Sequence, residues 1–445
     1  MKIDELILKN SHWQTGTIAH HSYPFKRKLF DKIQLDSRYA ISISGLRRTG
    51  KSVLLSQLVE KYLTQNKQLD PKQVLLFSFD DDDSQDLLPN EELESLFDIY
   101  FKQIQNSHPQ VIKKPILFAL DEIQNVKNWQ SIIKKYYDLN PHFKFILTGS
   151  SSLYIQENVE SLAGRTIDYQ LDCLDFQEYL EITSQKIDIK FIQNIAELNL
   201  VTPFFIPKAY QERFEEFLLI GGFPDTALMQ AKNVSIPEIQ RFIRDSIIKK
   251  IIHKDLRKYF KLENTSADAR LYEVICRESG TFLELKNLAS EVKLSVMTIK
   301  KHLEIFEKSS ALGFLPRFDK KLRREISSTR KIYATSPCIM NAMIYNSTSS
   351  DSALMGHVAE TYAYNQLRRL TEKLYVNKGR QNEEIDFSAP LEKMLIECKY
   401  SERLKYEDFS YLRRESEKSK QQALILSKSS FENLGRIKCV PVMVL

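Results

Sequence analysis

Residues 41–63, ISISGLRRTGKSVLLSQLVEKYL, contain the pattern that decides the fold of the amino-terminal part of this chain. Two glycines, a lysine and a serine stand in the spacing G-x-x-x-x-G-K-[ST], which is typical of a loop that wraps around phosphate groups. Apolar residues before the loop indicate the end of a strand, and those after it recur at helical spacing. The stretch therefore predicts a strand, a phosphate-binding loop and a helix whose amino end attracts anions.

Several residue types in this loop have a recognised use in binding a nucleotide. The glycines let backbone amides close around phosphates, the lysine reaches the β- and γ-phosphates, and the serine can hold Mg²⁺. ATP and Mg²⁺ are therefore the expected cofactors. The loop residues predicted to contact the nucleotide are Gly45, Arg47, Arg48, Thr49, Gly50, Lys51 and Ser52, the last also being a predicted metal ligand.

A second apolar run, ILFALDEIQ after Pro115, carries two carboxylates at its carboxyl end, where parallel sheets place their chemistry. We interpret it as a Walker B strand, in which Asp121 holds the water shell of Mg²⁺ and Glu122 accepts a proton from the attacking water. A third run, FKFIL, is followed by TGSSS, so that Thr148 or Ser150 could sense the γ-phosphate. A plain polar turn after this strand is an equally good interpretation.

The composition is that of a folded protein with several domains. The 445 residues exceed one ordinary core, and 42% of them are hydrophobic and 27% charged. The five cysteines lie far apart without a C-x-x-C pair, which argues against a disulfide framework or a zinc cluster. With neither a long apolar run nor a basic leader, the expected location is the cytoplasm and no membrane partner is expected.

The net charge of +6 is unevenly distributed along the chain. Residues 226–335 contain 23 Lys and Arg against 13 Asp and Glu. Basic residues concentrated on one module suit a partner with a phosphate backbone, although a basic solvated surface is the commoner explanation. DNA is therefore a candidate partner of this part of the chain.

The three motifs together resemble those of a large family of bacterial and archaeal AAA-type ATPases. In that family the P-loop reads G-x-R-R-x-G-K, the Walker B reads D-E-I-Q and the third strand ends in T-G-S-S-S, as all three do here. The resemblance implies an ATP-hydrolysing core followed by a helical lid, and it makes a homo-oligomer a candidate assembly. It also makes Arg165, in the sequence A-G-R, a candidate second sensor or subunit-crossing finger; a purely structural role is the alternative. The chain departs from the family at Cys173, where proline is usual.

Residues 263–339 have the pattern of a winged helix. Helices are predicted over 267–277 and 285–292, and a third helix, capped by Ser295, extends to residue 308. The outward face of the third helix would carry Thr298, Lys300 and Lys301. The basic residues of the following segment, which resembles a DNA-contacting wing, are Lys320, Lys321, Arg323, Arg324, Arg330 and Lys331. Because winged helices also serve as protein–protein modules, packing between domains is the alternative.

Residues 340–445 carry a second set of charged groups. Asp386 and the E-x-K pair of Glu397 and Lys399 lie on two predicted strands joined by a turn. With Glu360 on a predicted helix upstream, the set resembles the restriction-endonuclease-like (PD-(D/E)XK) fold, and the ATPase family carries such a domain at its carboxyl end. The resemblance implies that these four residues are catalytic, that Asp386 and Glu397 chelate Mg²⁺, and that Lys399 positions water for phosphodiester cleavage. An inert module of the same fold is the alternative.

The expected fold class is α/β in four modules. They are a P-loop AAA-like core with a parallel sheet at 1–170, a helical lid at 171–262, a winged helix-turn-helix at 263–339 and a small nuclease-like domain at 340–445. The expected function is a Mg²⁺-dependent AAA-type ATPase coupled to a DNA-binding winged helix and a nuclease-like domain, in nucleic-acid processing or defence. The alternative is a nucleotide-dependent switch or scaffold with an inert nuclease-like domain and a protein partner.

Overall fold

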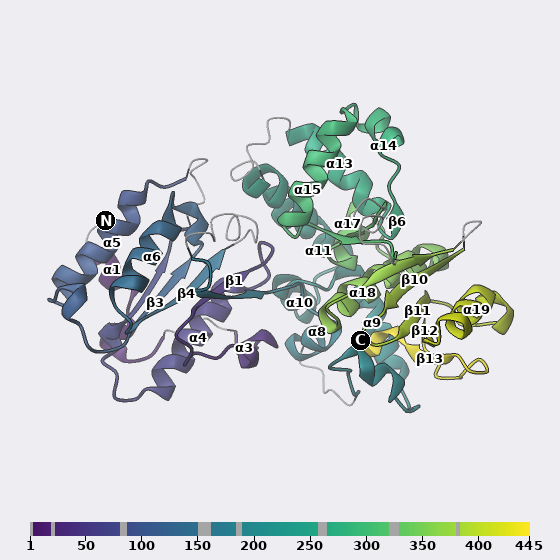
Figure 1. Cartoon of the computed structure of the whole chain (residues 1–445), viewed down its shortest axis with the longest axis horizontal. Helices are drawn as coiled ribbons and strands as arrows, with labels where there is room; N and C mark the ends of the chain where they lie inside the picture. The colour runs from purple at the N-terminus through teal and green to yellow at the C-terminus, as the bar shows by residue number, and fades with distance from the viewer. Residues whose placement is uncertain are drawn as a thin grey trace. The chain divides into compact units, whose positions relative to one another are not determined.

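The computed structural model in Figure 1 divides into two compact units. The first comprises residues 1–172, 253–263 and 308–310, and the second comprises residues 173–252, 264–307 and 311–445. The structure describes residues 3–18, 23–80, 87–149, 162–183, 189–256, 265–319, 329–379 and 383–445, without the side chains of residues 254 and 265. Within these ranges, none of the helices combines the length and apolar character needed to cross a membrane.

The first unit is built around a parallel sheet with the strand order β2-β3-β4-β1-β5. Its strands are β1 (Ala40–Ser44), β2 (Val74–Ser78), β3 (Ile116–Asp121), β4 (Phe143–Gly149) and β5 (Thr166–Gln170). The apolar runs predicted from the sequence form β1, β3 and β4, and every residue of β1 and β3 is buried. Because all strands run in one direction, their carboxyl ends meet at one edge of the sheet.

Helices cover both faces of this sheet. Its helices are α1 (Ile3–Lys9), α2 (His12–Thr15), α3 (Leu29–Lys32), α4 (Lys51–Gln65), α5 (Asn90–Ile99) and α6 (Trp129–Leu139). The apolar face of α4 and Phe30 of α3 pack on one side of the sheet. The apolar faces of α1, α5 and α6 pack on the other side, where Trp129 is among the largest fully buried side chains. The layers hold the strand ends, and thus the loops that follow them, in fixed positions.

The second unit contains a mixed sheet with the order β13-β12-β11-β10-β9. Its strands are β9 (Tyr375–Lys378), β10 (Glu384–Ala389), β11 (Met394–Lys399), β12 (Gln422–Ser427) and β13 (Lys438–Pro441). The predicted pair of strands joined by a turn is confirmed, because β10 and β11 are antiparallel with Phe387 opposite Ile396. The long helix α18 (Ser352–Leu370) contacts β11, and α19 (Ser410–Ser419) packs against the apolar core that includes Ile385 and Leu395.

The second unit also contains a smaller sheet with the strand order β6-β8-β7. Three helices and these strands follow one another along the chain in the order expected for a winged helix. The elements in chain order are α13 (Thr265–Arg277), β6 (Thr281–Phe282), α14 (Leu285–Val292), α15 (Val296–Lys308), β7 (Leu312–Leu315) and β8 (Lys331–Ala334). The predicted helices are confirmed to within a few residues. The predicted cap is also present, because the amide of Thr298 donates to Ser295 Oγ at 3.0 Å. The remaining helices of the unit are α8 (Phe176–Ile182), α9 (Lys208–Ile220), α10 (Pro224–Ala231), α11 (Ile236–Phe242) and α17 (Pro337–Met343).

The small sheet and the mixed sheet of the second unit are joined by backbone hydrogen bonds. The amide of Phe318 donates to the carbonyl of Val376 at 2.9 Å, and the amide of Val376 donates to the carbonyl of Pro316 at 2.9 Å. Helix α18 contributes Tyr364, whose ring stacks on Tyr333 of β8 with 4.1 Å between ring centroids. The two predicted modules therefore pack against each other over a shared core.

Candidate functional site

The P-loop forms the turn between β1 and α4, as the sequence predicts. Gly50 has φ of 95°, a left-handed conformation that favours glycine, and α4 begins at the next residue. The side chain of Lys51 is folded back into the loop, where Nζ donates to the carbonyls of Gly45 at 3.1 Å and Leu46 at 2.9 Å. These two carbonyls hold the ammonium inside the loop.

Gly45 lies where the chain has no room for a side chain. A Cβ on this residue would lie 2.3 Å from the backbone oxygen of Leu171. We therefore expect Gly45→Ala to displace the loop and weaken ATP binding. Because each hydrogen bond to a charged group contributes about 1.5–3 kcal/mol, losing one or more should raise the dissociation constant roughly 10- to 100-fold. Isothermal titration calorimetry measures this change.

The matched control is Gly356→Ala, because a Cβ on this residue of α18 would meet no heavy atom within 4 Å. Alanine is the better helix former by up to about 1 kcal/mol, so this variant should fold and bind ATP as the wild type does. An unchanged dissociation constant in Gly45→Ala would contradict the expected displacement of the loop.

Asp121 ends β3 in a network of hydroxyl groups at the edge of the sheet. Thr148 Oγ1, at the end of the neighbouring strand β4, donates to Asp121 Oδ1, and Ser78 Oγ donates to Asp121 Oδ2 at 3.3 Å. The side chains of Thr148 and Asp121 are both buried. The parallel order of β2, β3 and β4 brings these three residues together from distant parts of the sequence. Ser78 was not singled out from the sequence, although it too ends a buried apolar run.

Glu122 follows Asp121 in a left-handed backbone conformation with φ of 50°. This conformation is uncommon for a residue other than glycine and is often found at functional sites. Its carboxylate lies 4.0 Å from Lys51 Nζ and accepts a hydrogen bond from Gln124 Nε2. The structure therefore brings the predicted base next to the predicted phosphate-binding lysine, with Gln124 holding it.

Two contacts that were not predicted from the sequence stabilise the P-loop. Arg27 donates to the carbonyls of Thr49 and Asp172, the latter at 2.8 Å. Arg47 pairs with Asp255, its Nε lying 3.3 Å from both carboxylate oxygens. Burial raises the pKa of the Asp255 carboxyl and Arg47 opposes this effect. Segment Ile251–Leu256 thus delivers a charged partner to a loop some two hundred residues earlier, and no local pattern marks that contact.

The remaining predicted residues of this site are placed as follows. Ser52 is exposed in the first turn of α4, and Arg48 has φ of 66°. Ser150 lies outside the described residues. The structure does not bring Arg165 to the P-loop within this chain: it precedes β5, at the edge of the sheet opposite the loop, and its guanidinium pairs with Asp138. A role for Arg165 as a finger toward another subunit stays a prediction.

The second unit holds a cluster of carboxylates around one lysine. Lys331 Nζ lies 3.0 Å from Glu360 Oε1 and 3.3 Å from Asp386 Oδ1, and it also pairs with Glu384 Oε1. The hydroxyl of Tyr333 donates to Glu360 Oε1 at 2.8 Å. Burial alone would lower the pKa of Lys331, but the surrounding carboxylates outweigh burial and raise it. Two predicted residues, Glu360 and Asp386, therefore meet, and the lysine between them comes from β8.

The E-x-K pair flanks this cluster. Asp386 donates its amide to Glu397 Oε2 at 3.4 Å, and Asp386 Oδ2 accepts the amide of Cys398 at 2.9 Å. Burial, with the charge of Asp386 adding to it, raises the pKa of Glu397 well above its ordinary value, and the same two causes raise that of Glu360 to about 7. Lys399 is exposed and, with Glu360, lines a pocket of about 750 Å³. The four predicted residues thus gather at one end of β10 and β11.

The two sites differ in how well they fit a magnesium ion. At the P-loop, the oxygens of Ser52 and Asp121 are the ligand type that Mg²⁺ prefers, and phosphates would complete the set. In the acidic cluster, the oxygens of Glu360 and Asp386 are already engaged with Lys331. Within the described parts of the chain, no three His, Cys, Asp or Glu side chains are grouped to hold a metal ion. The arrangement of the acidic cluster therefore does not fit a metal ion as it stands.

The parallel sheet and the edge formed by Lys51, Asp121 and Glu122 define the class of the first unit, which is a P-loop ATPase domain of the AAA type. In agreement, residues 37–180 match the AAA domain family. Residues 211–350 match a domain of unknown function, DUF8612. That second match spans the predicted boundary between the lid and the winged helix, whose identities stay predictions.

Two uncharacterized proteins of Methanocaldococcus jannaschii are similar to this chain. One is 28% identical over 310 residues, which cover 67% of this chain and 62% of that protein. The other is 25% identical over 355 residues, which cover 78% of this chain and 70% of that protein. The chain thus spans less than two thirds of the first relative. A solved Walker-type ATPase of Pyrococcus abyssi is 16% identical with a TM-score of 0.45, covering 74% of this chain and 98% of that one.

Proposed function

We propose that this chain is a Mg²⁺-dependent ATPase whose nucleotide state controls a DNA-binding winged helix and a nuclease-like module. One observation carries the first part: Lys51, Asp121 and Glu122 meet at the carboxyl edge of the parallel sheet. Catalysis of phosphoryl transfer consists mainly of positioning and charge stabilisation, which such a group supplies. Mg²⁺, held with ATP by Ser52 and Asp121, would neutralise charge on the phosphates.

The residues of the first unit have separate tasks in this reaction. Lys51 exchanges the carbonyls of Gly45 and Leu46 for the β- and γ-phosphates, so the cost of freeing it is small. Glu122 accepts a proton from the water that attacks the γ-phosphorus, and Gln124 keeps the carboxylate oriented. The bond between the γ-phosphorus and the bridging oxygen breaks, which leaves ADP and phosphate.

Arg47 connects the nucleotide site to residues near the end of the predicted helical lid. It is a P-loop residue, and it pairs with Asp255 of the segment Ile251–Leu256. A bound triphosphate is a competing anion for the guanidinium, because Arg binds phosphate and carboxylate with the same donors. ATP binding would therefore weaken the pair between Arg47 and Asp255, and hydrolysis would restore it. This exchange is the proposed switch.

The ATPase proposal is tested by titrating ATP into the purified full chain with Mg²⁺ and by measuring phosphate release. The expected result is saturable binding and turnover that stops when EDTA removes Mg²⁺, because the ion is needed to neutralise the phosphates. A full chain that binds no nucleotide in the millimolar range would contradict the proposal.

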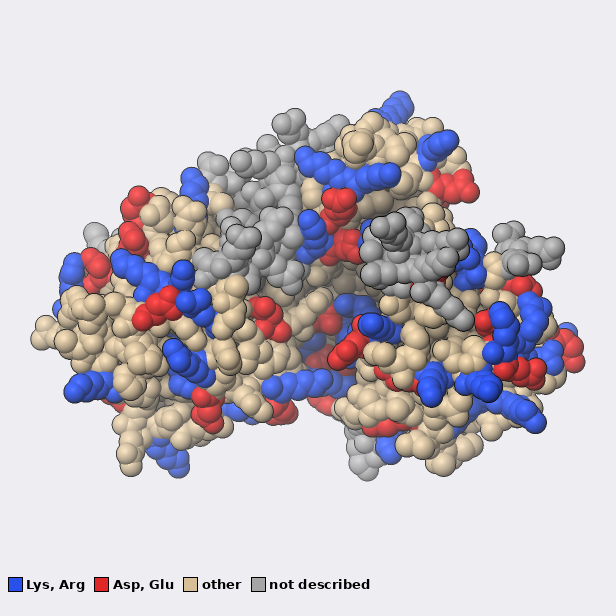
Figure 2. All heavy atoms as spheres, in the orientation of Figure 1, with Lys and Arg blue, Asp and Glu red and all other residues tan. Residues whose placement is uncertain are grey.

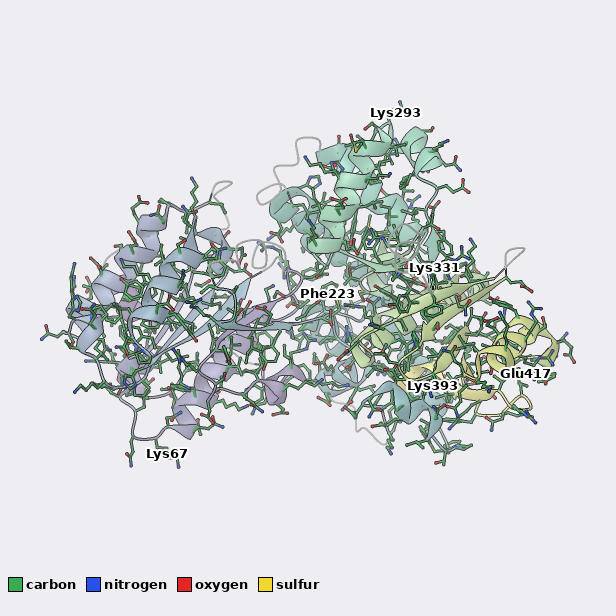
Figure 3. All side chains as sticks on the ribbon, viewed as in Figure 1. Lys67, Phe223, Lys293, Lys331, Lys393 and Glu417 are labelled. Atoms are coloured by element: carbon green, nitrogen blue, oxygen red, sulfur yellow. The ribbon has the colours of Figure 1, made fainter. Side chains whose placement is uncertain are left out.

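Helix α15 supports DNA binding by the module that contains it. Lys300 and Lys301 are exposed on this helix, beside Met297, whose exposed fraction is 77%. Figure 2 shows several Lys and Arg side chains at the outer end of the α13–α15 module, where Lys293 is labelled in Figure 3. Two basic residues of the predicted wing are described: Arg330 pairs with Glu307, and Lys331 is buried in the acidic cluster. The basic residues at 320–328 lie outside the described residues.

The double variant Lys300→Ala, Lys301→Ala should therefore weaken DNA binding at every sequence. Each phosphate contact contributes about 0.9 to the slope of log K against log salt, so that slope should become shallower by about 2. Fluorescence anisotropy of a labelled duplex at several salt concentrations measures this. The control removes two exposed lysines elsewhere, Lys67→Ala and Lys393→Asn, and should leave the slope unchanged. Equal slopes in the two double variants would contradict a role for α15 in DNA binding.

The nuclease-like module supports two candidate functions. Glu360, Asp386, Glu397 and Lys399 gather at one site, which supports phosphodiester cleavage. The pairing of Lys331 with the carboxylates favours the alternative, an inert module in a nucleotide-dependent switch or scaffold. Cleavage of linear, supercoiled and branched DNA with Mg²⁺ or Mn²⁺, with and without ATP, separates them when Asp386→Ala, Lys399→Ala is the control. Cleavage by the wild type alone supports a nuclease; ATP hydrolysis without cleavage supports the switch or scaffold.

A further inference from the structure

Lys331 lies in the interior of the second unit, although it ends the basic run that resembles a DNA-contacting wing. Its side chain is 4% exposed. In Figure 3 it lies between the α13–α15 module and the β9–β13 sheet, whereas Lys293 lies at the outer end of that module. An ammonium group is costly to bury unless opposite charges surround it. The three carboxylates of Glu360, Glu384 and Asp386 meet this requirement.

The same three carboxylates depend on Lys331. Glu360 belongs to α18, and Glu384 and Asp386 belong to β10, so two separate elements direct negative charge at one point. Carboxylates that all lie within ion-pair distance of one ammonium are close to one another. Their like charges repel strongly in a partly desolvated site unless a cation lies between them. A divalent ion would bind through these same carboxylate oxygens, at about 2.0–2.6 Å. The ammonium of Lys331 and a metal ion would therefore compete for one position.

The strand that carries Lys331 is held firmly in place. Strand β8 is the central strand of the small sheet, paired with β6 and β7. Ala334 donates its amide to Ser279 Oγ at 3.0 Å, and its carbonyl accepts Asn365 Nδ2 of α18 at 2.9 Å. Tyr333 donates to Glu360 from the same strand. These contacts fix the backbone of β8 and thereby hold the ammonium of Lys331 in the cluster.

We propose that Lys331 is the resident cation of the nuclease-like site, where its ammonium takes the place of a divalent metal ion and keeps the carboxylates free of metal. This inference rests on the nuclease-like module of the proposed function. Lys399, the lysine expected from the sequence to work in this site, is exposed and lines the neighbouring pocket. The charge of the site is therefore set by a residue of the proposed DNA-binding module.

The test is a titration of Mn²⁺, without nucleotide, into the full chain and its variants. The wild type and Lys331→Arg, which keep the cation, should show no saturable site that depends on Asp386. Lys331→Met should gain such a site. Its dissociation constant for Mn²⁺ should be at least about tenfold lower than that of any residual Asp386-dependent binding in the wild type. Adding Asp386→Asn to Lys331→Met should remove that site. The binding that remains in the double variant, including any at the P-loop, is subtracted as background.

Thermal unfolding gives a second readout for the same variants. Lys331→Met should unfold at a lower temperature than the wild type in EDTA, because three carboxylates lose their counter-charge. Mn²⁺ should raise its midpoint by several degrees and should hardly move that of the wild type. If Lys331→Met does not fold, the double variant Lys331→Met, Glu384→Gln removes one charge of each sign and is used in its place.

Two results would overturn the proposal. The first is a saturable Mn²⁺ site in the wild type that Asp386→Asn removes. The second is a folded Lys331→Met, alone or with Glu384→Gln, that gains no Mn²⁺ site. These outcomes are distinguishable from failure of the proposed function. Metal binding by Lys331→Met without DNA cleavage by the wild type would leave the inference standing and exclude the nuclease. ATP hydrolysis by the wild type, with no gained metal site in Lys331→Met, would overturn the inference and leave the ATPase standing.

Discussion

Replacing Lys51 with alanine is expected to raise the dissociation constant for ATP by about 10²- to 10⁴-fold, because charge-assisted hydrogen bonds of about 1.5–3 kcal/mol to each of two phosphates are lost. Lys51 is almost fully buried, and its ammonium is already held at the loop by the carbonyls of Gly45 and Leu46. No other lysine stands in the G-K-[ST] position of this loop. The loss can be measured by calorimetry with a slowly hydrolysed ATP analogue and Mg²⁺.

The matched control for Lys51→Ala is Lys67→Ala. Lys67 is an exposed residue just beyond the end of α4, so its removal changes the net charge equally without touching the loop. The dissociation constant of Lys67→Ala for ATP should equal that of the wild type. The thermal midpoint of Lys51→Ala should be recorded as well, so that a folding defect is not mistaken for lost affinity. Unchanged affinity in a folded Lys51→Ala would overturn the assignment of the P-loop.

The second large effect is expected for Glu122→Gln. A general base contributes about 10²- to 10⁴-fold to the rate, so kcat should fall by that factor. The dissociation constant for ATP should change little, because glutamine fills the same space and the lysine and the loop amides remain. The 4.0 Å between Glu122 and Lys51 supports this role, since it places the carboxylate at the γ-phosphate end of the loop. Single-turnover hydrolysis beside an equilibrium titration separates the two quantities.

Glu91→Gln makes the same chemical change at an exposed position in the first turn of α5 and should leave both quantities unchanged. Gln124→Ala should lower kcat by less than Glu122→Gln does, because it removes only the group that orients the base. Wild-type turnover in Glu122→Gln would show that the proton is accepted elsewhere.

The P-loop part of the site could be predicted because its residues lie in three short segments with strong local patterns. The strand, loop and helix around Lys51 follow from periodicity and glycine spacing, and Asp121 and Thr148 each end an apolar run. Parallel strands bring such ends together by geometry alone, so no knowledge of side-chain packing was needed. The same holds for the antiparallel pair that carries Asp386 and Glu397.

The placement of single charged residues could not be predicted in this way. Lys331 and Arg330 are neighbours in one basic run, yet one is buried among carboxylates and the other pairs with Glu307 near the surface. Lys331 is the first residue of β8 and Arg330 precedes the strand. Successive side chains of an extended chain point to opposite sides, and the carboxylates of α18 and β10 lie on the side of Lys331. Glu384, which lies two residues before Asp386, joins the cluster through the same packing.

The sequence by itself determined the class of the first unit, the strand, loop and helix around Lys51, the order of α13, α14 and α15, and the pair of strands β10 and β11, because these depend on residues close together in the chain. Tertiary structure alone decided that Arg47 meets Asp255, that Arg165 lies at the edge of the sheet away from the P-loop, and that Lys331 occupies the acidic cluster. The position of Arg165 follows from the pairing of β5 with β1, whereas the other two depend on the burial of charge between segments far apart in sequence. Such burial is stable only when packing brings the opposite charge within a few ångströms, and no local pattern records that.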